Sequence, residues 1–151
     1  MKYVLIILAS VVSLQLLAQE GARIKNNNLE DDLAIKGYDP IAYFTQKKAI
    51  KGTESYKYVH EGIPYWFSSQ INLDTFKSSP DKYEPAYGGW CAYAMGTTAE
   101  KVVIDPETFK IVDGKLYLFY NFFFNNTLKD WNKDEVNLKQ KADANWSEII
   151  R

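Results

Sequence analysis

From Leu33 onward, the apolar residues of this chain come in short blocks that are separated by glycine, proline and aspartate. Such blocks are typical of short strands and helices, and they lack the regular alternation of strand and helix that builds a parallel sheet. We therefore predict an α+β fold of β-hairpins packed with short helices, in one domain over residues 33–150 that ends in a helical segment. Residues 19–32 are polar and include three consecutive asparagines, so we expect a flexible lead-in there.

The first 18 residues have the pattern of a secretory signal peptide. The positive Lys2 precedes an apolar stretch over residues 4–17, and the small Ala18 follows it. This stretch is shorter than the roughly 20 residues that a membrane-spanning helix needs. We expect removal of residues 1–18, a periplasmic or secreted mature protein, and no stable membrane insertion after cleavage.

Composition and charge exclude several classes of protein. The 151 residues are 46% hydrophobic and 25% charged, which is typical of a globular domain and not of a disordered chain. Lys and Arg number 18 and Asp and Glu number 19, so the formal net charge is −1. Because the chain has no basic surplus, it has no electrostatic basis for binding nucleic acid, and we expect no such partner.

Turn and capping residues predict the local elements. Asp39 followed by Pro40 predicts the start of a short helix, because aspartate caps a helix and proline fits its first position. The pair Asp113-Gly114 suits the positive φ angles of a type I′ turn and predicts a hairpin around it. The other predicted elements are a hairpin over residues 55–68 that turns at His60-Glu61-Gly62, a helix that begins after Ser68 or Ser69 and ends before Pro80, and helices over residues 122–150.

Four sequence blocks occur in a recognisable order. They are GYDPIAYF (37–44), VHEGIPYWFSS (59–69), FKSSPDKYEPAYGGWCAYAM (76–95) and DPETFKIVDGKLYLFYN (105–121), followed by ADANW (142–146). Together they resemble the exported YHS-domain family over about residues 33–148. The resemblance implies a small YHS-type α+β domain, in which the hairpin at 55–68 and the helix after it form the YHS unit. The carboxy-terminal blocks are then an extension of that unit.

The resemblance also implies a class of function, from which this chain departs in part. Other branches of the YHS family look like metal-handling modules that occur beside copper and heavy-metal transport domains. They carry cysteines in the Asp-Pro block and where the second strand meets the helix. This chain has Ala42 and Ser68-Ser69 at those places. Since a soft metal needs thiolate or thioether donors, the family's own site is missing here.

Three other side chains are candidates for a metal site. Cys91 is the single thiol, and in a helical segment it would share a face with Met95 at i and i+4. Such a sulfur pair suits Cu(I), and His60, the single histidine, would be a third donor. Cys91, Met95 and His60 are therefore our candidate metal site, with a copper ion as the candidate cofactor. The alternatives are a buried Cys91 that packs as a small hydrophobe and a His60 that lies solvated in its turn.

The chain is also rich in aromatic residues, with 11 Tyr, 8 Phe and 4 Trp. Most aromatic side chains fill cores, but neighbours in a strand point to opposite faces, so not every ring can be buried on one side. Trp66, Tyr87 and Trp90 are our candidates for a groove that binds a small ligand.

Three functional hypotheses follow. The first is an exported binding or accessory module that handles metal in the periplasm. The second is an aromatic-lined module that binds a small ligand without metal. The third is a thiol enzyme or redox protein with Cys91 as nucleophile and His60 as base. The short motifs of common enzyme classes are absent, so we favour a binding module and assign no catalytic residue.

Overall fold

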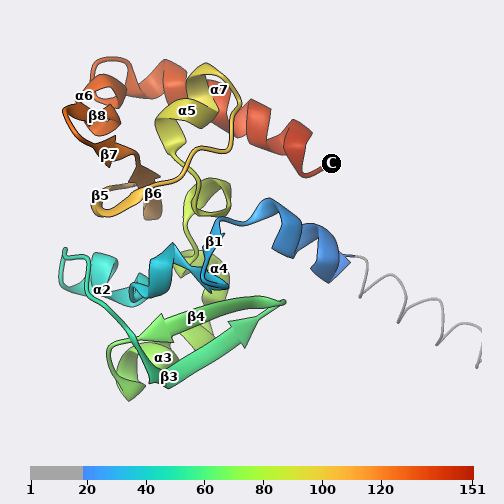
Figure 1. The fold of residues 1–151 in the computed structure, drawn as a ribbon, viewed down its shortest axis with the longest axis vertical. Helices are drawn as coiled ribbons and strands as arrows, with labels where there is room; N and C mark the ends of the chain where they lie inside the picture. The colour runs from blue at the N-terminus through green and yellow to red at the C-terminus, as the bar shows by residue number, and fades with distance from the viewer. Residues whose placement is uncertain (1–18) are drawn as a thin grey trace, which may run out of the picture.

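The computed structural model describes residues 19–151, and the predicted signal peptide at 1–18 lies outside the described residues (Figure 1). Within them, the strands form four separate antiparallel pairs, which are β1–β2, β3–β4, β5–β6 and β7–β8. Short helices cover these hairpins, so the α+β prediction is confirmed. No helix in residues 19–151 has the length and apolar character that crossing a membrane requires.

The elements divide between two halves of the molecule, drawn below and above in Figure 1. The lower half contains β1 (Leu29–Glu30), β2 (Leu33–Ala34), η1 (Ile35–Gly37), α2 (Pro40–Thr45), β3 (Thr53–His60), β4 (Ile63–Phe67), α3 (Gln70–Ser78) and α4 (Pro80–Tyr83). The 3-10 turn η2 (Ala86–Gly89) leads to the upper half. The upper half contains α5 (Ala92–Thr97), β5 (Asp105–Val112), β6 (Lys115–Phe119), β7 (Asn121–Phe122), β8 (Asn125–Asn126), α6 (Thr127–Trp131) and α7 (Glu135–Ile149).

The Asp39 carboxylate joins three elements of the lower half. It is completely buried and accepts a hydrogen bond from the backbone N–H of Ile41 at 2.9 Å, as expected of the cap of α2. Its other oxygen accepts bonds from the backbone N–H and the hydroxyl of Ser68, at 2.8 and 2.6 Å, and from the amide of Asn72 at 2.6 Å. The start of α2, the end of β4 and the first turn of α3 are therefore held at one point.

Both predicted hairpins are confirmed. His60 pairs with Ile63 across the turn of β3–β4, and Val112 pairs with Lys115 across the turn of β5–β6. Asp113 has a φ of 51° and Gly114 has a φ of 74°, so both residues adopt the left-handed conformation that a type I′ turn requires.

The carboxy-terminal segment differs from the prediction of helices throughout residues 122–150. Residues 121–126 form the small hairpin β7–β8, and helices begin only at Thr127. The side chain of Asn126 caps α6 by accepting from the N–H of Leu128 at 3.1 Å. The hairpin leaves Phe123 and Phe124 in solvent, whereas a helix here would have to place three consecutive rings around its circumference.

Residues 19–32, expected to be a flexible lead-in, are instead ordered against the domain. Residues 19–26 are helical, and Asn28 is buried between the lead-in and η2. The backbone N–H of Asn28 donates to the carbonyl of Gly88 at 2.8 Å, and its side-chain amide donates to the carbonyl of Gly89 at 3.1 Å. Two of the three consecutive asparagines, Asn27 and Asn28, therefore donate their side-chain amides to backbone carbonyls.

The hydrophobic core has two clusters, one centred on β4 and α3 and the other between α5, β6 and α7. In the second cluster, α5 and α7 come so close that a Cβ atom on Gly96 would lie 2.6 Å from the carbonyl oxygen of Leu138. Only glycine fits at this contact, because any side chain would clash with the backbone of α7.

We expect Asp39→Ala to lower the free energy of unfolding by about 3 kcal/mol, because it removes a helix cap and leaves buried donors without a partner. Urea unfolding of residues 19–151 measures this change. Asp39→Asn keeps an acceptor oxygen for Ile41 and is the matched control, with a smaller loss. If both variants unfold within about 0.5 kcal/mol of the parent chain, Asp39 does not hold these elements together.

Candidate functional site

Cys91 is fully buried at the amino-terminal end of α5. Its sulfur accepts a hydrogen bond from the backbone N–H of Tyr120 at 3.3 Å and lies 3.5 Å from the hydroxyl oxygen of Thr127. The thiol thus links α5 to the segment that follows β6, and it has no exposed surface. This placement matches the alternative that we gave for Cys91, a small buried hydrophobe.

Met95 lies one turn after Cys91, and the segment is helical, which was the condition for the predicted i, i+4 pair. It is also fully buried, but it packs in the cluster of Phe119 and Trp131, whereas Cys91 packs in the other cluster. The i, i+4 spacing is therefore correct, yet neither side chain is open to an ion from solvent.

His60 lies in the other half of the molecule, at the end of β3, and Figure 1 shows the β3–β4 hairpin at the opposite end from α5. The predicted metal site at Cys91, Met95 and His60 is therefore not assembled in this structure. The physical reason is that His60 is fixed by its own hairpin and by the rings of Tyr58 and Phe76, at centroid distances of 6.4 and 6.1 Å.

His60 instead meets two carboxylates. Its Nε2 atom lies 3.9 Å from Oδ1 of Asp81, and ligand atoms of His60, Asp81 and Glu84 all lie within 4.8 Å of one another. The His60 side chain is only 16% exposed, and its Nε2 is buried with no hydrogen-bond partner among residues 19–151. A buried polar atom without a partner is costly, so this nitrogen is a candidate ligand atom for another group.

Glu84 takes part in this cluster through one oxygen. Its Oε1 atom accepts hydrogen bonds from Arg23 and from the hydroxyl of Tyr65, the latter at 2.9 Å. Burial, reinforced by the charge of Glu84, raises the pKa of Tyr65, so the hydroxyl stays protonated and donates. Because both described partners bind Oε1, the Oε2 atom is the one that remains for an ion.

The charge around His60 is negative on balance. Three carboxylates, those of Glu61, Asp81 and Glu84, lie near two cations. Arg23 forms salt bridges with Glu61 and Glu84. Lys115 donates to the backbone carbonyl of Asp81. One imidazole and two carboxylates form a donor set of nitrogen and oxygen, which suits borderline divalent ions such as Zn²⁺ and Cu²⁺ better than Cu(I).

A cavity of about 490 Å³ adjoins this cluster. The helical residues 19–26, η2, β6 and α7 line it, and its lining also includes Glu84, which belongs to the His60 cluster, and Lys115. Tyr87 and Trp146 supply aromatic surface, and the Tyr87 hydroxyl donates to Asp143 at 2.9 Å.

The three aromatic residues predicted to form one groove lie apart. Tyr87 lines this cavity, whereas Trp66 lines a different hollow beside β2. Trp90 lines neither of these two hollows, and its Nε1 donates to the carbonyl of Asn26 at 2.7 Å. The reason is that alternate residues of β4 face opposite sides, so Trp66 points away from the side that Tyr65 shares with Glu84.

Comparison with known proteins identifies the lower half. Residues 41–87 match the family model of the YHS domain. The chain is a YHS domain-containing protein. No curated protein and no solved structure matches it. The matched YHS segment runs from α2 to η2 and contains the predicted unit of hairpin and helix, together with His60, Asp81 and Glu84, and it ends before Cys91.

Sequence reasoning found His60 but missed its two acidic neighbours in the YHS domain. Asp81 and Glu84 are two of 19 acidic residues, and no spacing rule links them to a histidine more than 20 positions away. Their one signal is their place in the FKSSPDKYEPAYGG part of a block that carries the family resemblance. Only the folded structure, which places α4 and the residue after it close to the end of β3, brings them to His60.

We expect the Cys91 thiol to react with a thiol-labelling reagent at least about a hundredfold more slowly in the folded protein than in guanidinium, since labelling requires local opening. A time course of thiol labelling on residues 19–151 measures the ratio. The same sample, unfolded, is the control and should show one reactive thiol per chain, because Cys91 is the single cysteine. Rapid labelling of the folded protein would contradict the burial of Cys91 and would support the hypothesis of a thiol-dependent function.

Proposed function

We propose that this YHS domain-containing protein is an exported accessory module that binds a divalent metal ion through His60, Asp81 and Glu84. One observation carries the proposal, which is the buried Nε2 of His60 that faces two carboxylates and has no hydrogen-bond partner among the described residues. The resemblance to metal-handling YHS proteins agrees with this role, and the signal-peptide pattern is the basis for placing it in the periplasm or outside the cell.

The geometry suits a small ion. Two ligand atoms that each lie about 2.0–2.2 Å from a tetrahedral ion are separated by roughly 3.5 Å, and Nε2 of His60 lies 3.9 Å from the Asp81 carboxylate. The Asp81 side chain is 98% exposed, so it can turn toward an ion at little cost. Tyr65 and Arg23 hold Glu84 in place, as the outer partners of metal ligands do, and so would orient its carboxylate toward the ion.

The donor set also explains why the proposed ion differs from the Cu(I) of the sequence analysis. The sulfurs of Cys91 and Met95 are buried in the core, so the donors near His60 are carboxylate oxygens. These harder ligands favour Zn²⁺ or Cu²⁺.

We expect untagged protein, residues 19–151, to bind one Zn²⁺ or Cu²⁺ ion per chain in calorimetric titration with each metal alone. Affinity should fall at least about tenfold in His60→Gln and in Asp81→Asn, because each removes a ligand. It should also fall on acidification, because the ion needs a neutral imidazole. A histidine tag must be avoided, since His60 is the single histidine of the chain.

Cys91→Ala and Met95→Leu are the matched controls, and both should bind as the parent chain does. Either the absence of stoichiometric binding, or binding that survives in His60→Gln and disappears in Cys91→Ala, would contradict the proposed site.

A second candidate function rests on Lys115, at the wall of the 490 Å³ cavity. Its ammonium donates to the carbonyl of Asp81 at 3.1 Å, and within residues 19–151 it forms no salt bridge with a carboxylate. Burial lowers its pKa, because the half-buried ammonium loses hydration. A small organic carboxylate would supply the missing charge, and the rings of Tyr87 and Trp146 would contact its apolar part.

For this candidate, we expect the tryptophan fluorescence of chelator-treated protein to respond to a member of a panel of small carboxylic acids. Lys115→Met should weaken that binding by roughly 10- to 100-fold, the usual effect of losing one charge-assisted hydrogen bond. The exposed Lys129→Met is the matched control and should have no effect. A panel that leaves the fluorescence unchanged would rule out a carboxylate ligand of this class.

A further inference from the structure

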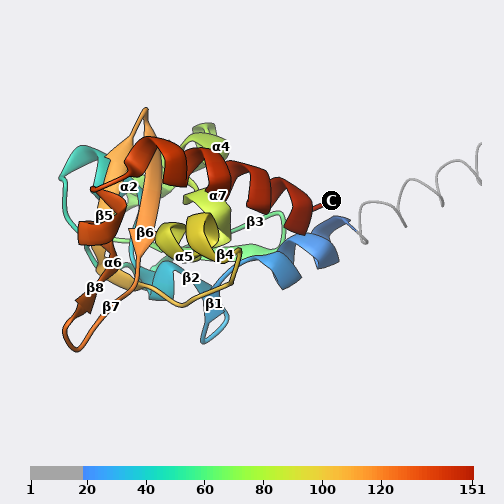
Figure 2. The ribbon, with the colours of Figure 1, turned by 90° about the horizontal axis from the view of Figure 1, so that it is seen from above.

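The turn between β7 and β8 exposes two phenyl rings completely. Phe123 is 99% exposed and Phe124 is 107% exposed, and Phe122 before them is 38% exposed. Figure 2 shows this hairpin projecting from the body of the molecule. We call Phe123 and Phe124 the knob.

The knob is not explained by the stability of the isolated chain. Phe123 has a φ of 55°, in the left-handed region that a bulky side chain rarely adopts. The same protein places Asp113-Gly114 in the turn of β5–β6, where those residue types suit the positive φ angles. The turn of β7–β8 instead combines backbone strain with two rings that lie in solvent. Both features are costly in an isolated chain, so they indicate that the knob contacts another surface.

A hollow of about 650 Å³ lies on the same side of the molecule. Half of its lining is apolar or aromatic, from Leu33, Tyr38, Pro64, Trp66 and Pro106, and the other half is charged, from Glu30, Asp31, Asp32, Lys36 and Lys51. An apolar cavity of about 150 Å³ holds one benzene ring, so this hollow has room for the two rings of a knob.

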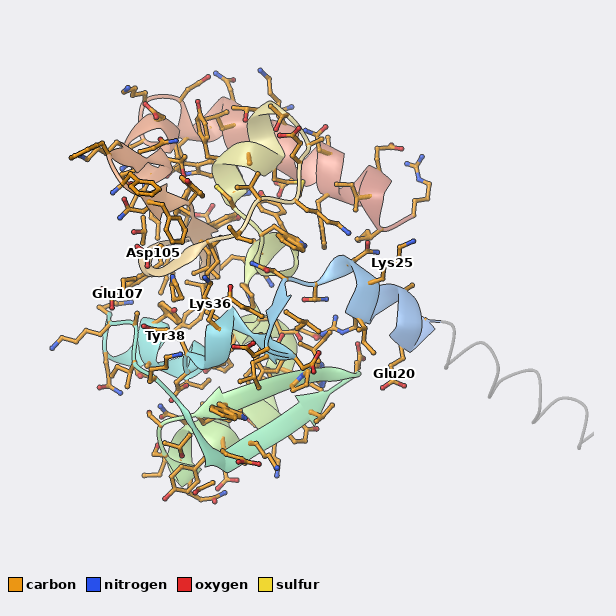
Figure 3. All side chains as sticks on the ribbon, in the orientation of Figure 1. Glu20, Lys25, Lys36, Tyr38, Asp105 and Glu107 are labelled. Atoms are coloured by element: carbon orange, nitrogen blue, oxygen red, sulfur yellow. The ribbon has the colours of Figure 1, made fainter. Side chains whose placement is uncertain are left out.

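The knob and the hollow are neighbours. The Lys36 ammonium lines the hollow and also lies 5.6 Å from the centroid of the Phe122 ring. Asn121 of β7 donates to Asp105 at 3.3 Å, and Figure 3 shows Asp105 close to Lys36 and Tyr38. In Figure 2 the β1–β2 turn, which borders the hollow, projects on the same side as β7–β8.

From this arrangement we propose that the chain forms a two-fold symmetric homodimer, in which the knob of each copy inserts into the hollow of the other. A two-fold contact uses the same patch on both copies, so it needs a projection and a recess side by side on one face. Four buried rings contribute roughly 600–1,000 Å² at about 150–250 Å² each, and the recesses contribute a similar area. The sum reaches the roughly 1,200–2,000 Å² of a stable interface.

Sedimentation of residues 19–151 over a wide range of protein concentration tests the dimer. We expect the parent chain to dimerise and the double variant Phe123→Asn, Phe124→Gly to associate at least about tenfold more weakly. Trp66→Ala in the hollow should also weaken association. Ile71→Ser, which removes an apolar side chain that is 77% exposed on α3, is the matched control and should dimerise normally.

Mixing the knob variant with Trp66→Ala provides the decisive measurement. One intact knob then meets one intact hollow, so the mixture should form heterodimers more tightly than either variant forms homodimers. If Trp66→Ala fails to fold, the knob variant still tests the proposal, because both of its replaced side chains are exposed. A parent chain that stays monomeric overturns the proposal. If the monomer instead binds phosphatidylcholine vesicles and needs Phe123 and Phe124 to do so, the two rings contact a membrane surface and the proposal is also overturned.

Discussion

A buried negative charge that must be hydrogen-bonded organises the lower half of this protein. The Asp39 carboxylate has no access to water, so its four donors from Ile41, Ser68 and Asn72 have to meet at one place. That requirement fixes the end of β4 against α2 and α3. Since β4 pairs with β3, it also fixes where the β3–β4 hairpin ends, and so where His60 lies over α4.

Elements that depend on adjacent residues could be predicted from the sequence, and those that depend on distant ones could not. Asp39-Pro40 and Asp113-Gly114 carry their own capping and turn chemistry, so the helix and the hairpin that they predicted are present. The order of residues 19–32 depends on carbonyls of η2 that lie about 60 positions later in the chain. A run of asparagines gives no sign of such a partner.

In the candidate site, too, local features could be predicted and distant contacts could not. The helical spacing of Cys91 and Met95 was predictable. The contacts with β6 and α6 decide in which cluster each side chain packs, and the Cys91 and Met95 side chains are both buried. His60 was identifiable because it is the single histidine. Its acidic neighbours were not, because α4 is a short turn whose position follows from its packing against α2, α3 and β6 rather than from its own four residues.

The close packing of the helical residues 19–26 has a consequence for maturation. Gln19 is part of the wall of the 490 Å³ cavity, and Arg23, one turn later, binds Glu84. If a signal peptidase cuts after residue 18, the new α-amino group arises on Gln19, in the lining of that cavity. Precursor and mature chain would then differ by one positive charge at this place, so proteolytic processing would set the electrostatic potential that an incoming ion or anion meets.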